Sequence, residues 1–565
     1  MKRCTTWTKT IALLLIGFMA LNLSAAPRKK KGTTSKISDY GYTQVAAINK
    51  KLRAHWSEYE LRHSPIATDS KWCRRVFLDI IGRIPKVSEL SDFLSSKKSD
   101  KRAVLVNELL YDEKYQAEYA RNWTTLWTNI LIGRNGGSER NSLTSRPGMQ
   151  KYLRDSFARN KPYNRIVHDL VTATGMTTPG TAKFNGATNF LAMKLAEGGA
   201  LATAESSKIF LGLQIQCTQC HNHPFNEWKQ QKYWEMNAFF RQTRALRRFR
   251  RGTRRVTGAE LVNQDYAGVT NNPDRADIFY ELRNGEVKVA YPKFVDGTGI
   301  GKSGYVSEVN RRKELGKMII KSPYLPKAMV NRTWAHFFGY GFTKPLDDLG
   351  PHNTATHPEL LEFLAKEFKE NSYDVKKLIS WIALSEAYSL SSKTNSTNVK
   401  ADDPQLGEKP KFSRFYLRQM RAEELYESLL TATEAHKTGA TYEAQEKDKR
   451  AWMRQFVVAF GNDEGEETTT FNGTIPQALM LFNGALVKKA TSADKGSFLT
   501  KIAKSNLKPG QKINYLFMAG LSRYASADEI KVANKLYVAR EGKATEALKD
   551  IWWAILNSNE FILNH

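Results

Sequence analysis

Apolar residues recur at helical spacing along most of the chain, and this pattern constrains the fold more than any other feature. Val45, Ile48, Leu52 and Trp56 follow steps of three and four residues, as expected for a helix with one buried face. Segments of the same kind lie at 72–81, 102–110, 115–131, 149–157 and 163–171. The pattern predicts a mainly α fold that begins with a helical domain over residues 41–245.

A second helical region is predicted over residues 321–565. Its apolar periodicity covers 357–371, 374–387, 418–431, 476–490, 513–521, 527–538 and 544–556. Thr356 and Glu359 have the spacing of a capping box, with Pro358 in the first turn. The polar tract 391–411 predicts an exposed loop. We find no longer period of the kind that indicates a solenoid.

The interval 246–320 has a different character from the helical regions on either side. Residues 278–282 and 287–291 are rich in β-branched and aromatic side chains, and Asn284-Gly285 lies between them. An Asn-Gly pair between two such runs is typical of a tight β-hairpin. We therefore expect two helical domains separated by a small β-containing insert.

The first residues predict export. Lys2, Arg3 and Lys9 precede the apolar run 11–23, which ends in small residues at 24–26. This is the order of a signal peptide over residues 1–26, and the run is shorter than the about 20 residues that span a bilayer. A basic linker follows at 27–40. No later stretch has 18 consecutive apolar residues, so we expect no transmembrane span after signal removal and a periplasmic, cell-surface or extracellular location.

The charge balance indicates the kind of partner. Lys and Arg number 86 against 57 Asp and Glu, a net charge of +29. An exported chain this basic is expected to meet an anionic polysaccharide or envelope surface rather than nucleic acid. The chain has only four cysteines, which excludes a disulfide-rich scaffold.

The sharpest chemical motif is Cys217-Thr218-Gln219-Cys220-His221, followed by Asn222 and His223. Cys-x-x-Cys-His is the attachment pattern of haem c, in which Cys217 and Cys220 bind the haem and His221 is an axial ligand of the iron. The sequence does not identify the second axial ligand. His223 lies too close to His221 to reach the opposite haem face, and Met236 and His168 are available residues.

Two alternatives to haem remain open at this motif. Cys217, Cys220, His221 and His223 are four ligands of the types that zinc prefers, although they are crowded into seven residues. A structural disulfide between Cys217 and Cys220 would need no cofactor, and the two histidines would then form hydrogen bonds in a turn. Cys73, in an amphipathic stretch, is expected to be a buried free thiol.

Residues 241–255 contain eight arginines and no acidic residue. Steps of three and four residues predict that several of them line one face of a helix that continues from Phe240. A run of this kind usually forms a solvated surface. Its density also suggests contact with a polyanion. The predicted polyanion-binding residues are Arg241, Arg244, Arg247, Arg248 and Arg251.

A second group of polar residues lies in the C-terminal half. Arg332, His336, Asp348 and His357 fall within 26 residues and could supply acid, base and anion-binding groups. The favoured alternative is structural, with Arg332 paired to Asp347 or Asp348, because no nucleophile with a positioned base is evident. The sequence leaves open whether the protein is an enzyme.

Several of these motifs resemble a known pair of domains. Residues 74–79, with the sequence Arg-Arg-Val-Phe-Leu-Asp, and 210–212, which lead into the cysteine motif, resemble the planctomycete cytochrome-type domain of unknown function. Residues 329–332 and 357–361 resemble its companion, the planctomycete surface-type domain of unknown function. The resemblance implies an exported protein of bacteria that degrade complex polysaccharides, with a cytochrome label that rests largely on Cys-x-x-Cys-His.

Two functions therefore follow from the sequence. The first is a haem c protein that serves electron transfer or redox chemistry in envelope or polysaccharide metabolism, together with a redox partner protein. The second is a non-catalytic scaffold or glycan-binding protein with a structural disulfide or metal site.

Overall fold

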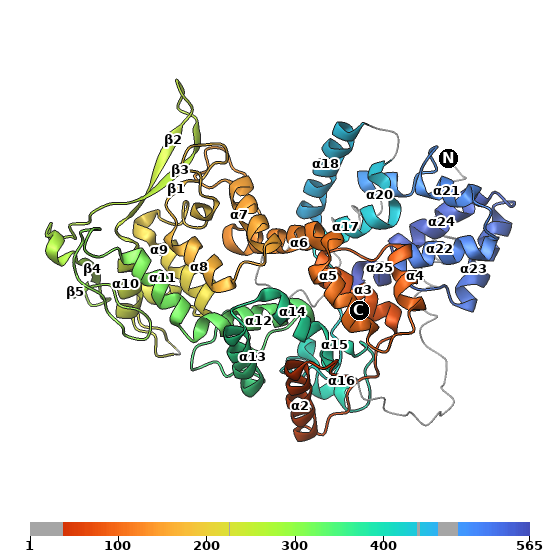
Figure 1. Ribbon diagram of the computed structural model, residues 1–565, viewed down its shortest axis with the longest axis horizontal. Coiled ribbons are helices and arrows are strands. Elements are labelled where there is room, and N and C mark those ends of the chain that lie inside the picture. Colours follow the sequence, from red (N-terminus) through yellow and green to blue (C-terminus); the bar gives the residue numbers. More distant parts are fainter. Residues whose placement is uncertain (1–37, 225, 438–440, 461–483) are drawn as a thin grey trace.

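The computed structural model describes residues 38–224, 226–437, 441–460 and 484–565. Over these ranges the chain is mainly α-helical, as the apolar spacing predicts (Figure 1). The predicted signal peptide, most of the basic linker and the first part of the helix predicted at 476–490 lie outside them. Among the helices that are described, none is long and apolar enough to cross a membrane.

The helices fall into two groups along the chain. The first group is α2 (Thr43–Glu58), α3 (Asp69–Ile81), α4 (Val87–Ser95), α5 (Lys101–Tyr111), α6 (Glu113–Ile132), α7 (Arg146–Ala158), α8 (Tyr163–Thr172), α9 (Ala200–Ser206) and α10 (Gln230–Asn237). The second group begins with α11 (Arg311–Lys321), α12 (Tyr324–Phe338), α13 (Pro358–Glu370), α14 (Val375–Ala383), α15 (Glu386–Ser389) and α16 (Asn398–Ala401). It ends with α17 (Ala422–Thr433), α18 (Tyr442–Phe460), α20 (Ala485–Ala490), α21 (Phe498–Lys504), α22 (Pro509–Leu521), α23 (Ala527–Ala539), α24 (Ala544–Leu556) and α25 (Asn559–Ile562).

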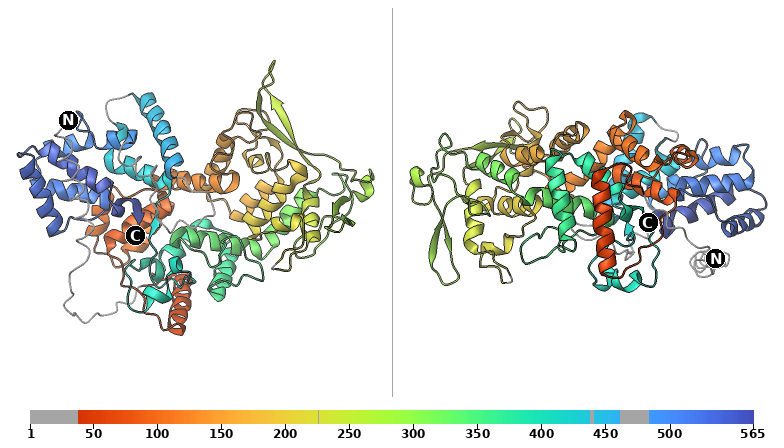
Figure 2. Two further views of the ribbon diagram at one scale, coloured as in Figure 1. Left: turned by 180° about the vertical axis from the view of Figure 1, so that it is seen from behind. Right: turned by 60° about the horizontal axis from the view of Figure 1, so that its bottom comes forward.

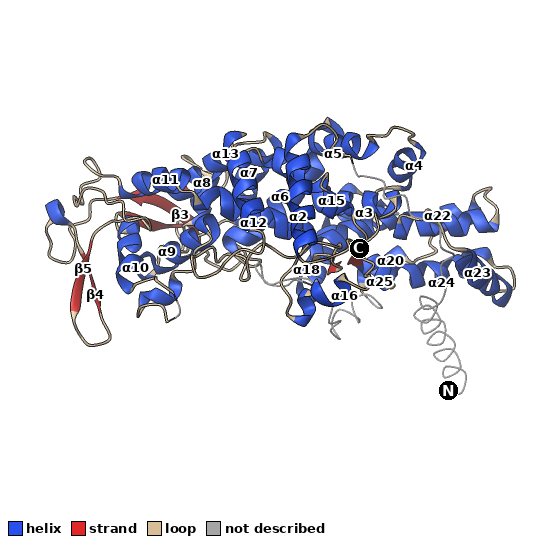
Figure 3. Ribbon diagram, turned by 90° about the horizontal axis from the view of Figure 1, so that it is seen from below, coloured by secondary structure: helices blue, strands red, loops and turns tan. Residues whose placement is uncertain are grey.

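The strands form three small antiparallel sheets. The first has the order β1 (Gly175–Met176), β3 (Val256–Asn263), β2 (Thr243–Phe249). The second pairs β4 (Ile278–Glu281) with β5 (Val287–Ala290), which confirms the hairpin predicted around Asn284-Gly285 (Figure 3). The third joins β6 (Arg418–Gln419) to β7 (Leu563–Asn564).

The prediction for the arginine run is wrong. Residues 243–249 form strand β2 rather than a helix, and β2 pairs along its length with β3. Cross-strand partners such as Ala245 and Leu261 place apolar side chains on the inner face. A strand alternates its side chains between two faces, so the three- and four-residue steps of the arginines do not produce one basic stripe.

The beginning of α13 also differs from the sequence prediction. His357 rather than Thr356 is the residue before the first helical turn, and the predicted capping box does not form. The Thr356 hydroxyl contacts Nδ1 of His357 at 2.9 Å, while Glu359 pairs with Lys51 at 3.0 Å. Pro358 still begins the helix, since its fixed φ suits the first turn.

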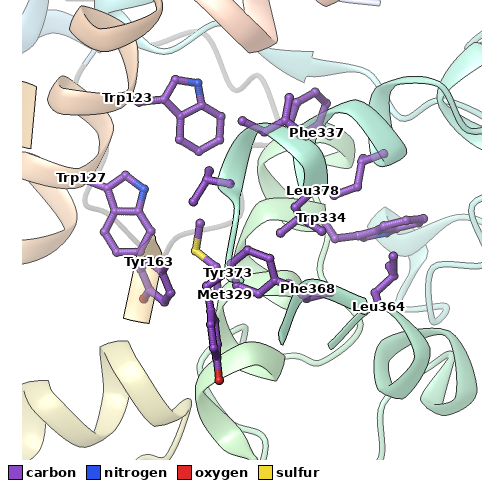
Figure 4. Close-up of a cluster of buried hydrophobic side chains, with 14 of the residues drawn as sticks. Trp123, Trp127, Tyr163, Met329, Trp334, Phe337, Leu364, Phe368, Tyr373 and Leu378 are labelled. Atoms are coloured by element: carbon purple, nitrogen blue, oxygen red, sulfur yellow. The ribbon is translucent and has the colours of Figure 1, made fainter. Parts of the chain in front are cut away.

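One hydrophobic core contains side chains from both predicted domains. Trp123 and Trp127 of α6 face Met329 and Phe337 of α12 across this core (Figure 4). The other labelled side chains of the cluster are Tyr163, Trp334, Leu364, Phe368, Tyr373 and Leu378. The layout of two separate helical domains therefore stays a prediction, because residues from 45 to 416 share buried contacts.

A second core lies at the other end of the molecule. It gathers apolar side chains from α17 to α25, and it also includes Leu78 of α3 and Ile84. The views from front and back both place α3 and α4 beside the helices of the C-terminal end (Figure 2). The N-terminal helices thus contribute to both cores.

Arg83 makes a compact set of contacts between α3 and α4. It follows Gly82, the left-handed residue that ends α3. Its guanidinium donates to Glu118 at 2.7 and 2.9 Å and to Glu89 at 2.8 and 2.9 Å. The same guanidinium lies 5.4 Å from the ring centroid of Phe77.

Arg523 repeats these contacts between α22 and α23. It follows Ser522, which is also left-handed. It donates to Glu560 at 2.7 and 2.6 Å and to Glu529 at 2.8 and 2.8 Å, and it lies 5.4 Å from the ring centroid of Phe517. We call Arg83 and Arg523 with their paired glutamates the two arginine clamps.

Candidate functional site

The Cys-x-x-Cys-His motif lies on a loop whose backbone is held by side-chain hydrogen bonds. A π-helical turn, Ser207–Leu211, leads into it, and a short 3₁₀ helix, Gln216–Gln219, carries its first residues. The buried Thr218 hydroxyl donates to the carbonyl of Ile215 at 2.6 Å. Two side chains of α10 donate to the carbonyl of Gln219, Gln230 Nε2 at 3.3 Å and Trp234 Nε1 at 3.1 Å.

The two thiols of the motif are accessible. Cys217 and Cys220 are exposed and unbonded to one another, whereas Cys73 is a buried free thiol. Burial raises the pKa of Cys73 well above its ordinary value, so this thiol is unreactive. The interior position of Cys73 agrees with the sequence prediction.

His221 has a defined ring orientation. Its Nδ1 lies 2.6 Å from the carbonyl oxygen of Asn222, so Nδ1 carries the proton and donates it to that oxygen. In the neutral ring, Nε2 is then the nitrogen with a free electron pair, the kind of atom that binds a metal ion. An accessible thiol pair followed by such an imidazole meets the requirements of haem c attachment.

The residues considered for a second axial ligand lie in different environments. Met236 is buried in α10 as part of the main core. His168 is on α8, where its ring packs against Gly316 of α11. His223 follows the motif directly, and its backbone N–H donates to the carbonyl of Trp228 at 2.8 Å.

A loop of the second half of the chain packs against the segment that leads into the motif. The backbone N–H of Leu349 donates to the carbonyl of Gly212 at 2.7 Å. Asp347 accepts from Gln214 at 2.7 Å and pairs with Lys208 at 3.4 Å. A side chain at Gly212 would collide with Leu349, so the missing Cβ permits this close approach.

The same loop carries an acid and an imidazole, and the imidazole lies near His223, just after the motif. Asp348 pairs with His352 at 2.8 Å. The ring of His352 lies with its centroid 6.1 Å from that of His223. The sequence places these two histidines far apart, and no local pattern signals their contact. Among the described residues, no group of three or more His, Cys, Asp or Glu side chains is arranged to hold a metal ion.

The four residues predicted as a second-domain cluster face different neighbours. Asp348 belongs to the loop just described. Arg332 lies on α12 one turn before His336. Its predicted pairing with Asp347 or Asp348 does not form, because Lys208, Gln214 and His352 engage those acids.

His336 and His357 pack against other parts of the protein. His336 Nε2 donates to the backbone carbonyl of Asp79 at 2.9 Å, and burial, with the charges of Arg421 and Arg418, lowers its pKa to about 3. His357 packs 3.9 Å from the ring of His55, and burial lowers its pKa well below the ordinary value. Both rings are neutral at pH 7.

A buried carboxylate, Asp79, joins several distant segments. It pairs with Arg418 and accepts from Tyr388 Oη at 2.5 Å and from Asn564 Nδ2 at 2.9 Å. Burial raises its pKa to about 6 in spite of the opposing charge of Arg418. Asp79 is the last residue of the Arg-Arg-Val-Phe-Leu-Asp motif, so this motif builds the junction between the two ends of the chain.

The arginines of the run separate into two kinds. Arg244, Arg247 and Arg251 are exposed on the β2–β3 hairpin, which projects from the body (Figure 1). Arg248 pairs with Glu260 of β3. Arg241 precedes β2 and packs against Gly198, and burial lowers its pKa. The exposed set also includes Arg250, Arg254 and Arg255.

The comparisons with known proteins agree with the order of the two resemblances. Residues 47–245 match the family model described as PSCyt2, protein of unknown function (DUF1549). Residues 311–537 match the family model described as PSD1, protein of unknown function (DUF1553). No curated protein and no solved structure matches the chain. The cysteine motif and the loop that packs against the segment before it thus lie in two different matched segments.

Proposed function

We propose that this chain, built from two families of unknown function in succession, is an exported protein that carries haem c on Cys217 and Cys220. The observation behind this proposal is the pairing of two exposed thiols with the oriented imidazole of His221. The bound haem would supply one-electron chemistry. The protein would serve electron transfer or redox chemistry in envelope or polysaccharide metabolism.

The protein's own residues would hold and orient such a group. Cys217 and Cys220 would form the covalent attachment, and the Asn222 carbonyl would keep the His221 ring in the tautomer that binds iron through Nε2. Gln230 and Trp234 would keep the loop rigid through the carbonyl of Gln219. The family name PSCyt2 is consistent with the cytochrome label that the sequence resemblance implies.

The first experiment is expression of the full chain in a host with a c-type maturation system. We expect a coloured protein that keeps its haem after denaturation, and loss of that haem when Cys217 and Cys220 are both replaced by Ala. Cys73→Ala is the matched control and should keep the haem, since its thiol is buried in the core. A colourless wild-type protein with a Cys217 to Cys220 disulfide by mass spectrometry would refute the proposal.

A second function has its own support in the β2–β3 hairpin. Exposed Arg244, Arg247 and Arg251 gather on one projecting element, and Phe249 beside them is 55% exposed. Guanidinium groups bind sulfate and carboxylate groups through paired hydrogen bonds. We propose that this hairpin binds an anionic polysaccharide.

Binding to an immobilised sulfated glycan tests the hairpin. We expect the variant Arg244→Glu, Arg247→Glu to lose most binding at physiological salt. The control changes the same charge on the other exposed hairpin, with Arg283→Glu and Lys288→Glu at β4–β5. Equal loss in both variants would mean that net charge alone drives binding, and unchanged binding in the first would exclude the hairpin.

A further inference from the structure

The loop formed by residues 344–353, which we call the covering loop, is held at several points against the segment that leads into the cysteine motif. Its backbone reaches Gly212 through Leu349, and its Asp347 reaches Gln214 and Lys208. Gln214 lies only a few residues before Cys217. Lys208 belongs to the π-helical turn, a rare geometry that is frequent at functional sites. The covering loop is therefore fixed against the segment directly before the motif.

This anchoring places the imidazole of His352 near His223. Its Nε2 lies 2.8 Å from Oδ2 of Asp348, so Nε2 carries the proton and donates it to the carboxylate. Nδ1 is then the ring nitrogen that has a free electron pair. A histidine whose other nitrogen donates to a carboxylate is the usual arrangement of a metal-binding histidine.

Gly350 makes room for this imidazole. A Cβ at position 350 would lie 2.6 Å from Cε1 and 2.7 Å from Nδ1 of His352. Any side chain at this position would push the ring away. The backbone N–H of Gly350 also donates to Asp348 at 3.3 Å, which holds the carboxylate in place.

We infer that His352, oriented by Asp348, is the second axial ligand of the haem iron. This inference rests on the proposed haem site. It is favoured over the other histidines because His168 packs on α8 against Gly316 and His223 is too close to His221 in the sequence. Met236 is enclosed in the main core. His352 alone among these candidates combines a contact with the motif loop and a carboxylate partner.

The site would then be shared by the two matched segments. The segment at 47–245 would supply the attachment and one ligand, and the segment at 311–537 would supply the other. Neither segment alone would give a six-coordinate iron. This arrangement accounts for the anchoring of the covering loop at Gly212, Gln214 and Lys208.

The test uses the full-length haem protein and reads the iron's coordination by absorption and electron paramagnetic resonance. Wild type should be low-spin, as expected for two strong axial ligands. His352→Ala should keep covalent haem and become high-spin, and added imidazole should restore the low-spin spectrum. His352→Met should raise the reduction potential, since a Met ligand does so in cytochromes c. His168→Ala is the control and should match wild type.

The outcomes separate this inference from the proposed function. A wild-type protein without haem removes the proposed function and the inference together. A haem-bearing protein that stays low-spin in His352→Ala refutes the inference alone. Loss of the low-spin signal in His223→Ala, with His352→Ala unchanged, would assign the ligand to His223. Gly350→Ala should reproduce the high-spin spectrum without removing any polar group, because its Cβ displaces the His352 ring.

Discussion

Asp79 connects segments that are as much as 485 residues apart in the sequence. It is fully buried, and its contacts with Arg418, Tyr388 and Asn564 bring β6 and β7 to α3. The Arg418 side chain is 3% exposed, so its charge depends on Asp79 for compensation. A charge left unpaired in the interior is strongly destabilising.

Replacing Asp79 by Ala should therefore lower the free energy of unfolding by about 3–5 kcal/mol. Asp79→Asn, which keeps the shape of the side chain, should lose less. Urea unfolding gives both values. The double variant Asp79→Ala, Arg418→Met should recover part of the loss, because it removes the uncompensated charge. Additive losses in the double variant would show that the two residues do not act as a pair.

The buried histidines make stability depend on pH. Burial lowers the pKa of His336 to about 3 and the pKa values of His357 and His565 also lie below their ordinary 6.5. As pH falls from 6.5 toward 3, the unfolded chain binds protons that the folded protein does not, so stability is lost. Asp79 has the opposite effect between pH 6 and 3.8, because its pKa is raised.

His357→Phe should reduce this acid sensitivity. The ring lies among aromatic side chains, 5.2 Å from Phe412 and 6.0 Å from Phe342, so Phe suits the site. At pH 7 we expect the free energy of unfolding to change by about 1 kcal/mol or less, because one hydrogen bond to Thr356 is lost. Between pH 7 and 4.5 the variant should lose less stability than wild type. An identical loss would mean that His357 is protonated in the folded protein.

The sequence could identify the motif of the candidate site but not its surroundings. Cys217, Cys220 and His221 lie within five residues, so their spacing alone predicts a haem site. His352 meets the same loop only through tertiary packing of the covering loop, and its own neighbourhood has no comparable signature. Arg332, His336, Asp348 and His357 were likewise grouped by sequence proximity alone, while tertiary packing gives three of them separate neighbours: Asp79 for His336, His55 for His357 and His352 for Asp348.

At the scale of elements, the strands that the sequence predicts correctly are those whose turn has a local sequence signature. The β4–β5 hairpin was predictable because Asn284-Gly285 encodes its turn within four residues. The β2–β3 hairpin was not predictable, because the arginines of β2 also fit a helical spacing. In addition, the turn that joins β2 to β3 has no Asn-Gly pair to mark it. Only the contact of β2 with β3, and of β3 with the distant β1, distinguishes strand from helix there.

Gly258 of β3 tests the packing of this hairpin. A Cβ there would lie 2.3 Å from the Thr178 hydroxyl and 2.7 Å from the Thr177 hydroxyl. Both hydroxyls bond to β3, so Gly258→Ala should destabilise by about 1–3 kcal/mol and increase amide exchange in the hairpin. Gly252→Ala is the control at the same hairpin: like Gly258 it has a positive φ, which strains a residue with a Cβ, but nothing lies within 4 Å of that Cβ, so it should affect exchange less. Equal exchange in both would contradict this packing.

At the scale of the whole molecule, the main core does not follow the predicted domain boundary. α6 and α8 bury aromatic side chains against α12 and α13 (Figure 4). Periodicity along a sequence identifies which face of each helix is buried, but it does not say which helix covers that face. The buried faces of the longer helices were therefore easier to predict than the helices that cover them.

A fragment of residues 38–245 should not fold on its own. Without α12–α14 it would expose side chains such as Trp123 and Trp127, which are 1% and 3% exposed in the full chain. We expect helical far-ultraviolet circular dichroism without a cooperative thermal transition, and strong binding of a hydrophobic dye. The full chain is the control. A cooperative transition in the fragment would establish an independent first domain.

The two arginine clamps match atom by atom. In each, the arginine follows the left-handed residue that ends one helix and lies six residues before a glutamate in the first turn of the next helix. Such agreement is what a duplicated helix pair would leave behind after its sequence had diverged. The aromatic residue precedes the arginine by six positions in both clamps, and the second glutamate follows it by 35 positions in one and 37 in the other. The two helix pairs that carry the clamps pack against each other through α4 and α22.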